Sequence, residues 1–186
     1  YYNRGNARSN LGENTGAIDD YNQALKLDPN YANAYAGRGN ARYGLGDNQG
    51  TIADYTQALK LDPNYANAYY KRGNARYGLG DNQGAIADYN QALKLDPNDA
   101  NAYAGRGNAR SRLGDKQGAI ADYTQAMTLN LNFNDAPNPN SANAYYNRGN
   151  ARSNLGENTG AIDDYNQALK LDPNYANAYA GRGNAR

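Results

Sequence analysis

The chain has 186 residues, with 19 Lys and Arg against 18 Asp and Glu, so its formal net charge is +1. It contains no Cys and no His, which excludes zinc fingers, thiol nucleophiles, Ser-His-Asp triads and imidazole acid–base pairs. The near-zero charge gives no general attraction to nucleic acid or to anionic membranes. No apolar run is long enough to span a bilayer, and the lack of Cys does not indicate a redox compartment.

A 34-residue repeat organises the chain. Pro29, Pro63 and Pro97 stand 34 residues apart in the context Lys-Leu-Asp-Pro-Asn, and the same context recurs at Pro173. The last interval is 76 residues, so it holds eight extra residues, which the alignment places at 130–137. We therefore expect a single array of five units and a terminal half unit, at about 1–31, 32–65, 66–99, 100–141 with the insertion, 142–175 and 176–186.

A longer periodicity lies above the repeat. Residues 1–42 are identical to residues 145–186, at an offset of 144. Both ends of the chain also fall inside the same predicted helix. This pattern indicates a window cut from a longer array, and an engineered array would look the same.

Each unit is predicted to form two helices, which in the second unit run from about Ala32 to Leu45 and from about Asn48 to Leu61. Gly46 suits the left-handed position that ends the first helix, and Asp47 suits the N-cap of the second. An Asp-Pro-Asn segment ends the second helix, and its Asn64 is expected to cap the next one. Because four glycines weaken the helices of this unit, stacking must hold them together.

Several positions of the unit match a known pattern. In the second unit they are Tyr35, Gly39, Thr51, Tyr55, Ala58 and Pro63. These residues resemble the signature of the tetratricopeptide repeat, which has Trp, Gly, Ala, Phe, Ala and Pro at those places of a 34-residue unit. The resemblance covers the whole chain. It implies an all-α, right-handed superhelical solenoid of antiparallel helix pairs, whose first helices line a concave groove for peptides.

Two arginine columns depart from the family signature. Arg38 and Arg42 are four residues apart and share one helix face, about 160° from Asn40. If Asn40 faces the groove, both arginines face the second helix, and a buried guanidinium needs a carboxylate. We interpret them as an internal Arg–Asp ladder; the alternative is a basic surface for nucleic acid or phosphate. The ladder residues are Arg38, Arg72, Arg106 and Arg148 with Asp54, Asp88, Asp122 and Asp164.

Eleven of the 19 Tyr fall in two columns that are predicted to fill the core. The first helices contribute Tyr1, Tyr35, Tyr69, Tyr103, Tyr145 and Tyr179, and the second helices contribute Tyr21, Tyr55, Tyr89, Tyr123 and Tyr165.

The candidate binding site is the polar face of the first helices. A double row of Asn amides offers donors and acceptors that fit an extended peptide backbone, and exposed Tyr supplies contact area at low entropic cost. A similar asparagine ladder lines the peptide groove of some tetratricopeptide proteins. The alternative is a merely polar, solvated face. The candidate residues are Asn40, Asn74, Asn108, Asn150, Asn67, Asn101, Asn143, Tyr43, Tyr70, Tyr77, Tyr146 and Lys71.

The leading hypothesis is a protein-interaction scaffold that binds an extended peptide or partner segment in this groove. Changing Asn74 and Tyr70 together to Ala is then expected to weaken partner binding and leave the melting temperature nearly unchanged. The alternative is a structural spacer or filament whose units stack end to end, with self-association in place of a ligand. Because no catalytic or phosphate-binding spacing is present, we expect no enzyme activity, cofactor, metal, nucleic acid or membrane partner.

The 42-residue unit carries one further expectation. Pro137 and Pro139 cannot both lie within a regular helix interior, so the chain must leave the helix before Pro137. We expect 130–137 to form a loop at the edge of the solenoid, with Leu131 and Phe133 folded back on the adjacent helix pair.

Overall fold

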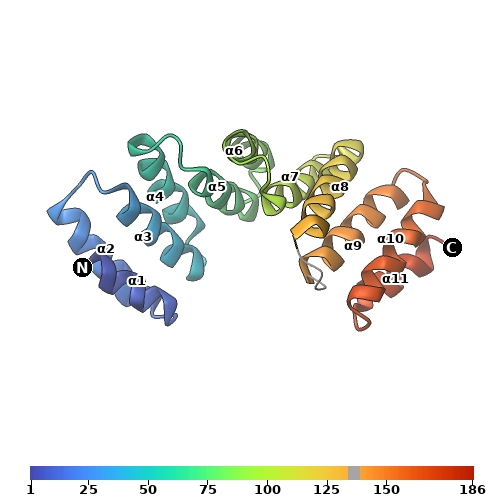
Figure 1. Cartoon of the computed structure of the whole chain (residues 1–186), viewed down its shortest axis with the longest axis horizontal. Coiled ribbons are helices and arrows are strands. Elements are labelled where there is room, and N and C mark those ends of the chain that lie inside the picture. The colour runs from blue at the N-terminus through green and yellow to red at the C-terminus, as the bar shows by residue number, and fades with distance from the viewer. Residues whose placement is uncertain (134–138) are drawn as a thin grey trace. The chain divides into compact units, whose positions relative to one another are not determined.

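The computed structural model of the chain describes residues 1–133 and 139–186. These residues form eleven α-helices and no strand. They divide into two compact units, 1–97 and 98–186. Consecutive helices pack as pairs within each unit (Figure 1), so the expected all-α fold of stacked helix pairs is confirmed.

The first compact unit contains three helix pairs. Their bounds are α1 Tyr2–Asn10, α2 Asn14–Leu27, α3 Ala32–Gly44, α4 Asn48–Leu61, α5 Ala66–Gly78 and α6 Asn82–Leu95.

The second compact unit contains two pairs and a final single helix. Their bounds are α7 Ala100–Arg112, α8 Lys116–Phe133, α9 Pro139–Ser153, α10 Asn158–Leu171 and α11 Ala176–Asn184.

The first helices of the pairs form a layer of their own. Within residues 1–97, α1 contacts α3 and α3 contacts α5, whereas α2, α4 and α6 make no such contacts with one another. Within the described part of 98–186, α9 likewise contacts α7 and α11. Ala34, Ala36 and Gly39 are buried small residues of α3. We call the face of these helices that carries Asn40 and Asn74 the free face. Side chains on the free face of successive first helices therefore lie side by side.

The helix ends follow the turn chemistry of the repeat, with one exception. Gly46 has φ +78° after α3, and the Asp47 side chain accepts a hydrogen bond from the Gly50 backbone N–H at the start of α4. The expectation that Asn64 caps α5 is wrong. The N-cap is Tyr65, without a side-chain cap bond, because the Asp62 side chain draws the Asn64 backbone N–H into the preceding turn.

The second-helix tyrosines form the centre of each pair, as expected. Tyr21, Tyr55, Tyr89, Tyr123 and Tyr165 are almost fully buried. Glycine makes room for these rings: a Cβ built at Gly5 or Gly37 would lie 2.9 or 2.7 Å from the Tyr21 ring. Tyr21 is thus held between α1 and α3, which links one helix pair to the next.

The first-helix tyrosines are less buried than expected. Tyr35 is half-buried between Leu25 of α2 and the Tyr55 cluster of α4. Tyr1 and Tyr179 are exposed by 59% and 50%, so their prediction as core residues is wrong. Tyr1 is the N-cap of α1, and Tyr179 lies in α11, so each has neighbours on one side only among the described residues.

The unit with the insertion has a longer second helix than the other units described. Helix α8 has 18 residues, against 14 in α6, and runs to Phe133. Residues 130–133 are therefore helical, which corrects the expectation of a loop over the first half of the insertion. Residues 134–138, and the side chains of Leu131 and Phe133, lie outside what the structure describes.

Candidate functional site

Each buried aspartate of a second helix is held by two arginines of the first helix. Arg38 donates from Nη2 to Asp54 Oδ1 at 2.6 Å and from Nε to Oδ2 at 3.0 Å, and Arg42 donates from Nη1 to Oδ2 at 2.9 Å. The same arrangement occurs at the other described pairs, in which Asp20, Asp88, Asp122 and Asp164 accept from Arg4 and Arg8, Arg72 and Arg76, Arg106 and Arg110, and Arg148 and Arg152.

The first arginine of each unit, such as Arg38, also connects successive helix pairs. Arg38 donates to Asn22 Oδ1 of α2 at 2.6 Å and lies over the Tyr35 ring, with its Cζ 5.5 Å from the ring centroid. In the later pairs Arg72 reaches Thr56 and Arg148 reaches Thr124. The Arg38 guanidinium of α3 thus bonds side chains of α2 and α4. It therefore links helices within the stack and does not lie on the free face.

The free face of the first helices carries an inner row of Asn whose side-chain oxygens bind the core. The Tyr55 hydroxyl donates to Asn40 Oδ1 at 2.6 Å, and Tyr89 does the same to Asn74 at 2.7 Å. The bond recurs from Tyr21 to Asn6, Tyr123 to Asn108 and Tyr165 to Asn150. Asn108 Oδ1 also accepts a hydrogen bond from Asn147 Nδ2 at 3.1 Å. The other inner Asn keep both amide hydrogens and one oxygen lone pair for a ligand.

The outer row of Asn is more exposed. Asn33 and Asn67 are exposed, and their side chains make no hydrogen bond within residues 1–97. Asn101 and Asn143 are also exposed, but Asn143 Oδ1 accepts from the Tyr175 hydroxyl at 2.6 Å. In the first compact unit the side chains of this outer row therefore make no hydrogen bond that holds the fold together.

The candidate tyrosines differ in how strongly they are packed. Tyr43 is 43% exposed, whereas Tyr70 lies against the buried Tyr89 with ring centroids 6.2 Å apart. Tyr146 packs between Tyr165 and Tyr175. Asn74 and Tyr70 thus both contact the core, so the expectation that changing them would leave stability unaffected is not supported by their surroundings.

The two remaining candidates also lie among tyrosines. Lys71 is half-buried, with its Nζ 5.7 Å from the centroid of the Tyr70 ring. Tyr77 is half-buried and lies near Tyr89. Burial is the main cause of the raised pKa of Tyr89, and the nearby Tyr70, Tyr77, Tyr43 and Asp88 raise it further.

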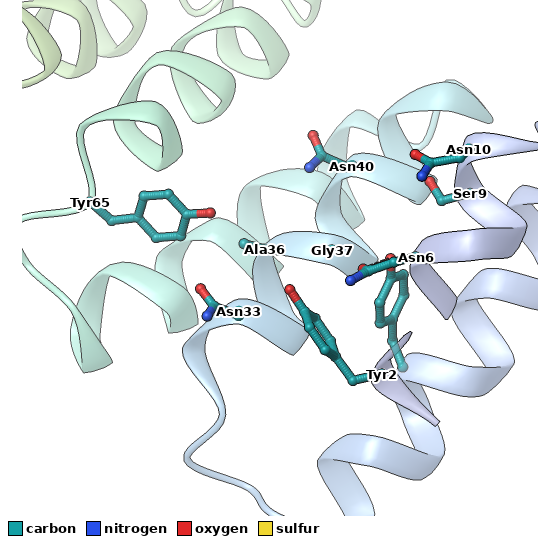
Figure 2. A pocket seen from close by; sticks show the side chains of 10 residues that line it. Tyr2, Asn6, Ser9, Asn10, Asn33, Ala36, Gly37, Asn40 and Tyr65 are labelled. Atoms are coloured by element: carbon teal, nitrogen blue, oxygen red, sulfur yellow. Dashed lines mark hydrogen bonds between the residues drawn. The ribbon is translucent and has the colours of Figure 1, made fainter. Parts of the chain in front are cut away.

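A pocket of about 280 Å³ opens on this face between α1 and α3. Its floor is Ala36 and Gly37, and the walls include Tyr2, Asn33 and Tyr65. Figure 2 shows the Tyr65 ring reaching from the connection before α5 towards Ala36, with Tyr2 approaching from α1. Among residues 1–97, no charged side chain lines this pocket.

Two of the tyrosines that line the pocket, Tyr65 and Tyr21, have raised pKa values. Burial raises the pKa of Tyr65, and the nearby Tyr2 and Asp62 raise it further. The pKa of Tyr21, which forms the back of the pocket, is raised to about 12 by burial, with Tyr2 and Asp20 contributing. The Tyr65 hydroxyl is therefore available as a hydrogen-bond donor, whereas that of Tyr21 already donates to Asn6 Oδ1.

Sequence reasoning missed two features of this face. It did not find the bond from each core Tyr to the inner Asn, although the two stand at a constant spacing of fifteen residues. It also missed the pocket, whose signal is the alternation of Tyr2, Ala36 and Tyr70 at one position of the repeat.

Two absences in the described part of the chain bear on function. Within residues 1–133 and 139–186, no group of three or more acidic, His or Cys side chains could hold a metal ion. None of the helices described is long and apolar enough to cross a membrane.

Family models match most of the chain. A model described as TPR repeat matches residues 5–46, 39–80 and 73–114. Two models described as tetratricopeptide repeat match residues 100–133 and 142–175. No curated protein sequence matches the chain.

Solved structures have the same fold. A crystal structure of MamA is 26% identical, with a TM-score of 0.83, over 95% of this chain and 98% of MamA. YrrB, described as a TPR protein with an unusual peptide-binding site, is 22% identical with a TM-score of 0.83, over 98% of this chain and 90% of its own. TTC0263, a thermophilic TPR protein of Thermus thermophilus, is 20% identical with a TM-score of 0.68, over 99% of this chain and 96% of its own.

Proposed function

The chain belongs to the tetratricopeptide repeat family, and we propose that it is a protein-interaction scaffold that binds an extended peptide segment along the free face of its first helices. The single observation that carries this proposal is the repetition of two Asn on that face in successive pairs, such as Asn33 with Asn40 and Asn67 with Asn74. The description of YrrB adds that a protein of this fold has a peptide-binding site.

The chemistry of the two rows suits a peptide backbone. An extended peptide presents carbonyl oxygens and N–H groups in regular alternation, and carboxamides can bind both. The inner Asn are oriented by their bonds to core tyrosines, so they lose little side-chain entropy when a ligand binds. The partner is therefore expected to be a protein or peptide, with its main chain as the recognised element.

The proposal is tested with a library of random linear peptides displayed on phage. We expect the chain to enrich peptides, and the double variant Asn33→Ala/Asn67→Ala to bind the enriched peptides at least tenfold more weakly. Both side chains are exposed and unbonded in the first compact unit, so the melting temperature should hardly change.

The matched control removes two other amides. Asn30→Ala/Asn64→Ala makes the same chemical change in the connections, where these residues are bonded through their backbone and not through their side chains. This variant should bind like the parent chain. If no peptide is enriched, or if both double variants bind equally well, the proposed site is wrong.

A second candidate function is end-to-end self-association as a structural spacer. Residues 145–186 repeat residues 1–42 without a change, which is the kind of periodicity that a stack of identical units requires. Light scattering should then show mass that grows with concentration, and a constant monomer mass would contradict this candidate.

A further inference from the structure

The pocket between α1 and α3 results from an alternation between successive units. At one position the first helices carry Tyr2, Ala36, Tyr70, Ala104, Tyr146 and Ala180, and each Ala is followed by Gly. Where the position is Tyr, its ring packs on a neighbouring Tyr: Tyr2 lies 4.8 Å from Tyr31 between ring centroids. Where it is Ala36, that space is left open above Gly37.

The open space is uncharged and carries polar groups without partners. The hydroxyls of Tyr2 and Tyr65 and the Asn33 amide make no hydrogen bond within residues 1–97. Asn40 and Asn6 have one oxygen lone pair occupied by a core hydroxyl and both amide hydrogens available. The pocket therefore offers both donors and acceptors in a site without charge.

The size of the pocket sets the size of its occupant. At about 280 Å³ it lies just below the range of sites for whole small molecules, which is roughly 300–1,000 Å³. It is large enough for one long side chain of a peptide whose backbone follows the asparagine rows. Figure 2 shows that Asn33 and Asn40, one from each row, border the same opening.

From these observations we propose that this pocket is a specificity site for one carboxamide side chain, Gln or Asn, of the bound peptide; this inference rests on the proposed function. A carboxamide is uncharged and presents a donor and an acceptor together, which matches the lining. A carboxylate or an ammonium would lose hydration here without a countercharge, which is costly. An aliphatic side chain would leave the hydroxyls and amides of the lining without partners.

The chain holds a second, partial copy of the pocket. Residues 145–186 repeat residues 1–42 without a change, so they supply Tyr146, Asn150, Asn177, Ala180 and Gly181 in place of Tyr2, Asn6, Asn33, Ala36 and Gly37.

The test compares two peptides on three forms of the chain. One peptide is taken from the phage selection with Gln at its preferred position, and the other has Leu at that position. The intact chain should bind the Gln peptide about tenfold more tightly, which corresponds to one or two hydrogen bonds. The variant Tyr2→Phe/Tyr65→Phe keeps both rings and removes two unbonded hydroxyls, so the preference should fall to about twofold while the affinity for the Leu peptide is unchanged.

The second variant closes the pocket. Ala36→Tyr introduces the residue that the chain itself has at Tyr2, where a ring packs beside Tyr31, and it should abolish the preference without abolishing peptide binding. If the intact chain enriches peptides but shows no Gln or Asn preference, or if the preference survives in both variants, the specificity site is wrong and the scaffold role stands. If it enriches no peptide, both proposals fail.

Discussion

The hydroxyl of Tyr55 donates a hydrogen bond of 2.6 Å to the side-chain oxygen of Asn40. Tyr55 is buried in the centre of a helix pair, whereas Asn40 lies exposed on the free face of the first helices. The bond therefore ties the core to the candidate binding surface, and it recurs in the other described pairs. A change in the inner asparagine row must affect stability as well as binding.

The first prediction follows from this bond. Asn74→Ala should lower the free energy of unfolding by about 1–2 kcal/mol, because the buried Tyr89 hydroxyl loses its partner. Urea unfolding followed by circular dichroism measures the difference. Asn67→Ala is the control, since that side chain is exposed and unbonded, and it should change stability by about 0.5 kcal/mol or less.

A double-mutant cycle separates the bond from other effects. Asn74→Ala/Tyr89→Phe removes both partners, so it should cost less than the sum of the two single changes. Additive costs would mean that the hydroxyl finds water when Asn74 is absent, and that the inner row is not tied to the core.

The second prediction concerns the buried aspartates. Asp88→Ala should destabilise the chain by about 3 kcal/mol, because it removes the shared partner of Arg72 and Arg76. Lys94→Ala, at an exposed position of the same helix, should cost about 0.5 kcal/mol or less. Equal and small effects in thermal unfolding would mean that these arginines are solvated, and would reopen the case for nucleic-acid binding.

Much of this arrangement could be predicted from the sequence because it depends on periodicity. The spacing of Arg38, Arg42 and Asn40 on a helical wheel fixes which of them share a face, and the recurring prolines fix the helix pairs. Asp47 and Gly46 mark helix ends through local turn chemistry that needs no tertiary context.

The remainder could not be predicted because it depends on where neighbouring pairs lie. Tyr179 has the same local sequence as Tyr35 but no helix that follows it in the described chain, so its exposure is set by stacking. The same holds for the pocket, in which Tyr2 and Tyr65 come from positions 63 residues apart. Their approach depends on the packing of α1, α3 and α5 as a layer.

The third prediction is a loss of stability in alkali. The pKa of Tyr21 is raised to about 12 in the folded chain by burial, whereas an unfolded Tyr titrates near 10. Because the folded pKa is the higher one, this stabilisation is complete below about pH 10 and declines as the pH rises towards 12. The urea midpoint should therefore fall over this interval.

A conservative variant isolates the contribution of one phenol. Tyr21→Phe loses the bond to Asn6, which lowers stability at every pH, but its midpoint should fall less steeply between about pH 10 and 12. Parallel curves for the variant and the parent chain would show that Tyr21 does not keep its proton on burial.

The last prediction compares two helical glycines. In an exposed helix, replacing Gly by Ala stabilises by up to about 1 kcal/mol. At Gly37, however, the added Cβ would lie 2.7 Å from the Cε1 of Tyr21. That ring cannot move away freely, because Gly5 of α1 is also close, with 2.9 Å from a Cβ built there to the same ring atom, and the hydroxyl is bonded to Asn6. Overpacking of this kind costs about 1–3 kcal/mol, so Gly37→Ala should be destabilising.

Gly183 gives the matched comparison, because a Cβ there would meet nothing within 4 Å. Gly183→Ala should be neutral or slightly stabilising, since it lies near the end of α11, where helix propensity counts for less. Thermal unfolding of the two variants then separates the cost of the added contact with Tyr21 from the gain in helix propensity. If Gly37→Ala stabilises as much as Gly183→Ala, the ring has room to shift, and the close packing of α1 and α3 on Tyr21 is not what sets the floor of the pocket.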